Sequence, residues 1–138
     1  MDSSIKPDKD LEFFLFYREL RRSFPRIDRM PVWQNADLIG DGVVHYQILS
    51  DIGDELVRWI QEGEINDVLT LLEVMEAAYV RSSTIRDPIY TDFVPALITY
   101  DGSEPRVKVR SMLKPALTQA YKALLGSYGT PAQIDRRP

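Results

Sequence analysis

Apolar side chains recur at the period of an α-helix along most of the chain. In residues 8–24 the large ones fall three or four positions apart: Phe13, Tyr17, Leu20 and Phe24. This spacing puts them on one face of a helix. Pro7 and Asp8 suit the start of that helix. Pro25 is expected to end it, because proline lacks a backbone N–H and clashes with the preceding turn.

The clearest pattern lies in the middle of the chain, where helices are predicted over residues 43–62 and 64–82. One apolar face of the first is made of Ile48, Leu49, Ile52, Leu56, Trp59 and Ile60. A wider stripe on the second contains Ile65, Val68, Leu69, Leu72, Met75 and Tyr79. Stripes of that width indicate contact on two sides. Since little more than Gly63 separates the two helices, and glycine suits the left-handed residue that ends a helix, we expect an antiparallel hairpin.

The flanking segments are less regular. Residues 25–42 are interrupted by proline, asparagine and glycine, so we expect an irregular connector packed by Trp33. Asp87 and Pro88 match an N-cap followed by proline at the first helical position. They predict a fourth helix through residue 98, which Pro95 should kink.

The C-terminal part contains one non-helical prediction and one helix. Residues 104–110 alternate charged and apolar side chains, a pattern that favours an extended connector or a short strand. The last helix is predicted to begin at Met112 or Pro115 and to run to Leu125. Gly126 is expected to end it.

Together these elements predict an all-α fold of about five helices. Antiparallel hairpins are expected to stack in a right-handed, armadillo-like arrangement or in an irregular bundle. A chain of 138 residues with 44% hydrophobic residues can fill one core. We therefore predict a single domain over residues 1–138, with its core in about 8–126 and flexible ends at 1–7 and 129–138.

Composition narrows the class of protein. The chain has no cysteine, which excludes disulfides, thiolate metal sites and a cysteine nucleophile. Charged residues occupy the N-terminal segment, and no run of eighteen apolar residues occurs anywhere. We expect a cytoplasmic protein without a membrane segment.

Catalytic chemistry is hard to assemble from this sequence. His45 is the single histidine, so a two-histidine metal site is excluded, and we expect it to be a partly buried or surface residue of a helix. Glu73 and Glu76 lie three apart on one predicted helix, with Asp51 or Asp54 on the preceding one. A carboxylate-based, metal-dependent enzyme is therefore one alternative. Because no phosphate-binding loop or nucleophile turn is present, we predict no catalytic residue, bound metal or cofactor.

Charge is distributed unevenly along the chain. Residues 37–104 contain fourteen acidic and three basic residues, whereas residues 105–138 contain one acidic and seven basic. The carboxylates that helical geometry places off the main apolar faces are candidates for binding a partner: Asp51, Asp54, Glu55, Glu62, Asp67 and Glu73. Such a surface attracts cationic proteins and repels nucleic acid. The alternative is that these groups only keep the chain in solution.

Five arginines lie close together before the acidic region: Arg18, Arg21, Arg22, Arg26 and Arg29. Basic groups among aromatic ones are typical of nucleic-acid binding. However, residues 1–36 carry seven basic against six acidic groups, and the sequence pI is about 5.0. We therefore expect these arginines to pair with the acidic hairpin and predict no nucleic-acid partner.

The middle of the chain resembles a group of small bacterial helical domains of unassigned function, some of which look like immunity proteins of toxin systems. The resemblance covers under half the chain and rests on four segments: residues 48–57 (ILSDIGDELV), Gly63-Glu64, residues 71–76 (LLEVME) and residues 90–97 (YTDFVPAL). Pro88 and Pro95 depart from the pattern in the last of these. The resemblance implies armadillo-type packing and a non-catalytic protein that blocks a partner, but it transfers no functional residue.

Our hypothesis is thus a small interaction protein, of the immunity-inhibitor type, that binds a cationic protein through the acidic hairpin. The first alternative is the carboxylate-based metal-dependent enzyme. The second is a structural homodimer formed through an exposed aromatic face near Phe13, Phe14 and Phe16.

Overall fold

A computed structural model describes residues 7–34, 45–97 and 104–128 of the 138-residue chain. Over these residues the protein contains helices and no strand, which confirms the predicted fold class. Five α-helices have seven residues or more: α1 (Pro7–Ser23), α3 (His45–Gln61), α4 (Ile65–Arg81), α7 (Glu104–Ser111) and α8 (Pro115–Tyr128). Of the ends that were expected to be flexible, 1–7 and 129–138, all but Pro7 lie outside the described residues.

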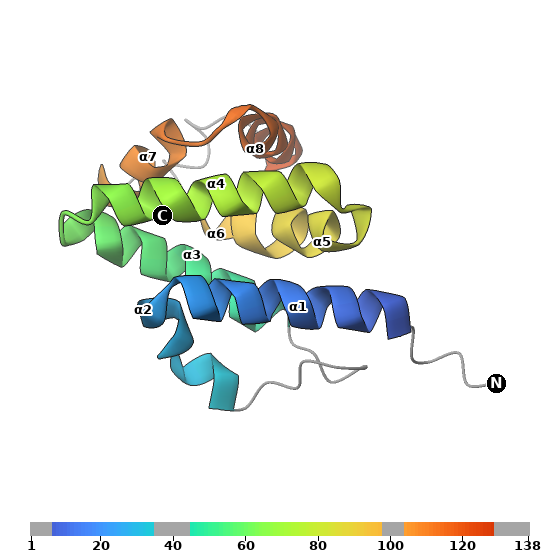
Figure 1. Cartoon of the computed structure of the whole chain (residues 1–138). Coiled ribbons are helices and arrows are strands. Elements are labelled where there is room, and N and C mark those ends of the chain that lie inside the picture. The colour runs from blue at the N-terminus through green and yellow to red at the C-terminus, as the bar shows by residue number, and fades with distance from the viewer. Residues whose placement is uncertain (1–6, 35–44, 98–103, 129–138) are drawn as a thin grey trace.

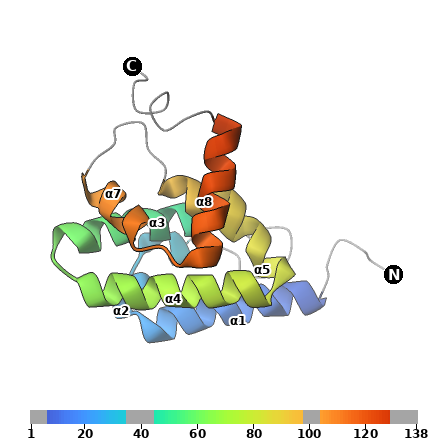
Figure 2. The same ribbon diagram turned by 90° about the horizontal axis from the view of Figure 1, so that it is seen from above.

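Helix α3 is the central element of the fold. It packs against α4, α6 (Val94–Ala96) and α7, and its side chains Ile48, Leu49, Ile52, Leu56 and Trp59 are buried. Helices α1 and α4 run alongside each other, and α7 and α8 lie on the side of α4 away from α1 (Figure 1). Seen from above, α8 runs across the direction of α4 (Figure 2). No helix among the described residues is long and apolar enough to cross a membrane.

The predicted hairpin of α3 and α4 is confirmed, and its turn has a well-defined end (Figure 1). Gly63 has a φ of 83°, the left-handed conformation that glycine adopts without steric cost. Its N–H donates to the carbonyl of Ile60, and the N–H of Glu64 donates to the carbonyl of Trp59. These two bonds form a Schellman motif, which satisfies carbonyls at the end of α3. The right-handed, armadillo-like stacking of such hairpins stays a prediction.

The fourth helix begins earlier than predicted. It starts with α5 (Ser83–Pro88), and the side chain of Ser82 accepts a hydrogen bond from the N–H of Ile85. The prediction of Asp87 as N-cap was wrong, because Ser82 caps the helix and Pro88 lies inside it. A π-helical turn, η3 (Ile89–Phe93), follows, and then α6 (Val94–Ala96).

The π turn lies next to Pro95, the residue that was expected to kink this helix. The N–H of Val94 donates to the carbonyl of Ile89, five residues earlier. A proline next in the chain has no N–H to continue the regular ladder, and π turns are one of the few ways in which a helix absorbs such an irregularity.

Two other local predictions were wrong. Residues 104–110 belong to helix α7 and not to an extended segment. In a strand Val107 and Val109 would share a face, but Val109 is buried whereas Val107 is exposed, as in a helix. A lone strand would have found no partner, and packing against α3 overrides the alternating pattern. Gly126 does not end the last helix but lies inside α8.

The expected irregular connector after residue 24 is in part helical. It contains α2 (Pro25–Asp28) and a 3₁₀ turn, η1 (Pro31–Gln34). The remainder, residues 35–42, lies outside the described residues. Trp33 packs this segment as expected, since its indole N–H donates to the carbonyl of Ile27 at 2.6 Å and its ring lies 5.8 Å from that of Tyr17.

Candidate functional site

The six acidic residues predicted to bind a partner do not share one surface. Asp54, Glu62, Asp67 and Glu73 are exposed and Asp51 is half-buried, whereas Glu55 is buried with 7% of its surface exposed. They also point to different neighbours, described below. Sequence periodicity placed five of them on two helices correctly, whereas Glu62 lies in the turn after α3. It carried no information on which elements cover those helices.

Glu62 and Glu73 show how far apart these groups lie. An oxygen of Glu62 is 2.6 Å from the guanidinium of Arg26 at the start of α2. The ammonium of Lys114, just before α8, lies 3.6 Å from Glu73. Because α2 and α8 lie on opposite sides of α4 (Figure 1), the two carboxylates face away from each other. The acidic surplus is therefore divided between several patches.

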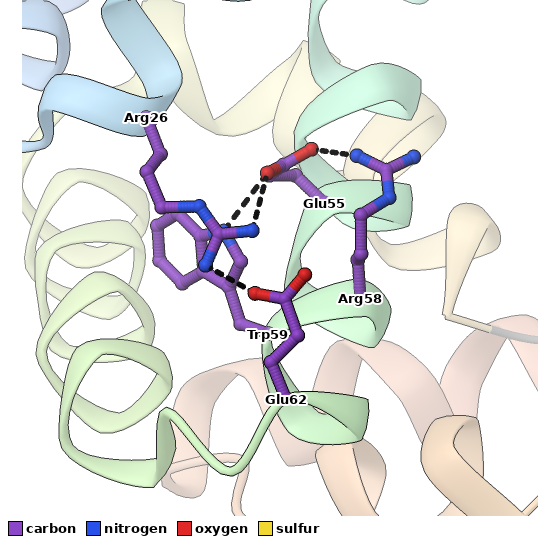
Figure 3. A network of polar contacts seen from close by, with 5 residues as sticks. All are labelled: Arg26, Glu55, Arg58, Trp59 and Glu62. Carbon is purple, nitrogen blue, oxygen red and sulfur yellow. Dashed lines mark hydrogen bonds and ion pairs between the residues drawn. The ribbon is translucent and has the colours of Figure 1, made fainter.

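Glu55 lies at the centre of a network that joins α2 to α3 (Figure 3). Its carboxylate accepts a hydrogen bond from the indole N–H of Trp59 at 2.9 Å and binds the guanidinium of Arg58. A guanidinium nitrogen of Arg26 lies 3.4 Å from it, and the same guanidinium lies 5.4 Å from the ring centroid of Trp59. Arg26 bridges Glu55 and Glu62 in this way.

This network decides the role of Glu55. A buried carboxylate needs compensating charges and hydrogen bonds, and the network supplies both. Its side chain is thus occupied within the chain and does not belong to the exposed acidic surface. The expected pairing of the N-terminal arginines with the hairpin is confirmed at Arg26, whereas Arg21 pairs with Asp28 at 2.7 Å.

Asp51 and Asp54 lie together beside a hollow of about 230 Å³, which Met30, Pro31 and Arg58 also line. Burial and the neighbouring charge of Asp54 raise the pKa of Asp51, and Arg58 offsets part of this rise. A raised pKa means that negative charge at this position is poorly compensated within the chain. Glu55 also lines this hollow, but its carboxylate is bound by Trp59, Arg26 and Arg58.

The carboxylates considered as metal ligands have other partners. Glu76 accepts hydrogen bonds from the backbone N–H groups of Ala116 at 2.8 Å and Leu117 at 2.9 Å, at the start of α8. Glu73 faces Lys114. Within the described part of the chain, no group of three or more histidine, cysteine or acidic side chains is arranged to hold a metal ion.

His45 is a partly buried helix residue, as expected, and begins α3. Its Nδ1 lies 2.6 Å from the hydroxyl oxygen of Tyr17, with which it forms a hydrogen bond. Its ring centroid lies 4.1 Å from that of Phe13. Burial raises the pKa of Tyr17 far above its ordinary value, so that hydroxyl stays protonated. The pair joins α1 to α3.

The aromatic residues considered as a dimer face are not fully exposed. Phe13, Phe14 and Phe16 are all half-buried. The rings of Phe13 and His45 are in tilted contact, and the guanidinium of Arg18 lies 5.9 Å from the ring centroid of Phe14. Phe16 turns instead towards a groove that the sequence did not reveal.

That groove lies between α1 and the α4–α5 segment and has a volume of about 530 Å³. It is lined by Glu12, Leu15, Phe16, Arg18, Glu19, Val74, Ala78, Arg81, Ser82 and Ile85. Leu15 and the neighbouring Leu11 are exposed by 41% and 55%. They lie on α1 away from the buried Tyr17 and Leu20. This second apolar stripe on the same helix is the sequence feature that could have indicated the groove.

Comparison with known proteins adds no family to this description. No protein-family model matches the chain, and neither a curated protein nor a solved structure matches it. The fold and its surfaces define a small all-α domain with an acidic hollow and an apolar groove.

Proposed function

We propose that this chain is a non-catalytic interaction domain of the immunity-inhibitor type, which acts in the bacterial cytoplasm by binding a cationic protein. The observation that carries the proposal is the pairing of Asp51 and Asp54 at a concave surface. Burial, and after it the neighbouring charge of Asp54, raises the pKa of Asp51. A lysine or arginine side chain of a partner seated in this hollow would interact with both carboxylates and stabilise ionised Asp51.

The charge of the surrounding hairpin supports the same proposal. Residues 45–81, which comprise α3, the turn and α4, contain eight acidic residues and two arginines. Some acidic groups are neutralised from other elements, as Glu62 is by Arg26 and Glu73 by Lys114. Glu64 and Asp67, close to the turn, are exposed. A field of this sign accelerates encounter with a basic protein.

Affinity capture from the native cells would test the proposal, with the chain as bait at low and at high salt. We expect a basic protein to be retained and then released as salt rises, because the Debye length falls from about 10 Å at 0.1 M to about 3 Å at 1 M. Asp51→Asn/Asp54→Asn should weaken retention, and Asp87→Asn, which changes an exposed carboxylate on α5, should leave it unchanged.

Retention that neither salt nor the Asp51→Asn/Asp54→Asn variant weakens would contradict the electrostatic basis of the proposal. Calorimetry then measures the affinity of the unmodified chain and of the two variants for the purified partner. This measurement separates direct binding from capture through a third component. Circular dichroism of each variant verifies that the fold is retained.

A further inference from the structure

The groove between α1 and α4 combines an apolar floor with charged walls, as binding surfaces do. Its floor consists of apolar side chains from three helices, among them Phe16, Val74 and Ile85. Its α1 wall carries Glu12 and Glu19 together with Arg18, whose guanidinium lies over the ring of Phe14. We propose that this groove binds an amphipathic helix of a partner protein, with basic side chains along the edge that meets α1. The groove is separate from the Asp51–Asp54 hollow, and the proposal does not depend on that site.

The shape of the groove favours a helix over an extended peptide. Helices α1 and α4 run alongside each other (Figure 1), and small side chains such as Ala78 line the α4 wall. The described residues offer no strand edge to which an extended peptide could hydrogen-bond. A helix satisfies its own backbone groups and needs only an apolar stripe to fill such a groove.

The charges favour a basic edge on that helix. Glu12 and Glu19 are seven residues apart on α1, which is two helical turns or about 10 Å. Within the described part of the chain, the hydrogen-bond partners of these carboxylates are neutral serines, Ser82 for Glu12 and Ser23 for Glu19. Two lysines or arginines at the same spacing on a partner helix would therefore face them. On the opposite wall Arg81 is exposed and suits an acidic residue on the other edge.

The same charges disfavour a second copy of this chain as the occupant. If α1 of one copy packed antiparallel along this side of α1 of another, one edge of the helix would meet the same edge of its counterpart. Glu12 would then face Glu19 of the other copy. This antiparallel arrangement brings like charges together.

The test uses the full chain, labelled with ¹⁵N, and a synthetic peptide of about 18 residues, a length that allows a helix to form. The peptide has a leucine stripe, two arginines seven residues apart on one edge, and alanine and glutamine elsewhere. A matched peptide replaces both arginines with glutamate. We expect the arginine peptide to shift the amide signals of Phe16, Ala78 and Ile85 saturably, and the glutamate peptide to bind more weakly.

Variants of the chain locate the effect. Glu12→Gln and Glu19→Gln should each lower the affinity for the arginine peptide roughly two- to fivefold, as expected for a surface ion pair. Leu15→Asp, at a half-exposed position that tolerates a polar side chain, should weaken it at least about tenfold because a charge would enter the apolar contact. Glu64→Gln, at the distant α3–α4 turn, should leave the affinity for the arginine peptide unchanged.

Several results would overturn the proposal. Equal affinities of the two peptides would contradict the proposed basic edge of the partner helix. If binding were not saturable, or if the shifted signals lay outside the groove, the groove would not be the binding site. If the groove signals moved with protein concentration alone, and sedimentation showed a dimer, the occupant would be a second copy.

Discussion

Glu76 in the middle of α4 accepts a hydrogen bond from the backbone N–H of Leu117, 41 residues further along the chain. The same carboxylate accepts the N–H of Ala116. The first turn of a helix leaves such groups without a partner inside the helix and carries partial positive charge. A side chain of α4 therefore performs the capping of α8, which fixes where the last helix docks.

Replacing Glu76 should loosen this docking. Glu76→Ala removes two charge-assisted hydrogen bonds from a helix N-terminus, and we expect the free energy of unfolding to fall by about 1–2 kcal/mol. Urea denaturation followed by circular dichroism measures it. Glu73→Ala, one turn earlier with an exposed pairing to Lys114, is the matched control and should cost less than about 0.5 kcal/mol. Equal costs for the two variants would argue against a capping role.

The network around Glu55 gives a second prediction. Glu55→Ala leaves the indole N–H of Trp59 without its acceptor and the two arginines without their shared carboxylate. We expect a loss of about 2–3 kcal/mol, at the lower end for a buried pair because both arginines can reach water. In Glu62→Ala, which removes an exposed partner of Arg26, the loss should stay below about 1 kcal/mol. Denaturant midpoints of the two variants test this order.

Much of the helical architecture could be predicted because the apolar periodicity of α1, α3 and α4 is strong and local. Gly63 identified the hairpin turn, since only a residue that tolerates positive φ fits there. The errors fall where tertiary packing overrides a local pattern. Val107 and Val109 alternate like a strand, yet they lie in a helix that packs on α3.

The surfaces were harder to predict than the helices. Periodicity places Glu55 off the centre of the apolar face of α3, but Arg26 and the α2 turn cover it, and no local pattern reports a contact between residues so far apart. The α1–α4 groove has the same origin. Phe16 and Ile85 line it from two different helices, and the packing of the core sets how these helices lie relative to each other. The pattern of apolar positions along the chain does not predict which residues of two helices come together.

A close helix contact supplies a third prediction. A Cβ atom added at Gly53 in α3 would lie 2.7 Å from the Cβ of Ala96 in α6. Gly53→Ala should therefore destabilise the fold by about 1–3 kcal/mol, although alanine is favoured by about 1 kcal/mol in an open helix. Ala96→Gly in the same chain should recover at least about 1 kcal/mol, a coupling that a double-mutant cycle measures.

Gly126 is the control for that experiment. It lies in α8 with nothing within 4 Å of an added Cβ. Gly126→Ala should raise the free energy of unfolding by about 0.5–1 kcal/mol, through helix propensity alone. If both alanine variants stabilised the protein, the steric contact between α3 and α6 would be wrong.

The raised pKa of Asp51 predicts how stability depends on pH. Because its pKa in the folded chain lies above the ordinary value of 3.8, the folded state binds more protons than the unfolded state between those two values. Stability therefore falls as the pH rises through that window, and ionised Asp51 destabilises the fold at neutral pH. Asp51→Asn should raise the free energy of unfolding at pH 7 by up to about 0.5 kcal/mol.

This gain should shrink as the pH falls below the ordinary pKa of 3.8, where the carboxyl of Asp51 becomes protonated in both states. Asp54→Asn should act in the same direction, because it removes the neighbouring charge that raises the pKa of Asp51. Urea denaturation at several pH values, with Asp87→Asn as an exposed control, measures the effect. A loss of stability in Asp51→Asn at pH 7 would mean that a compensating cation already neutralises this position, and the case for a cationic partner there would fail with it.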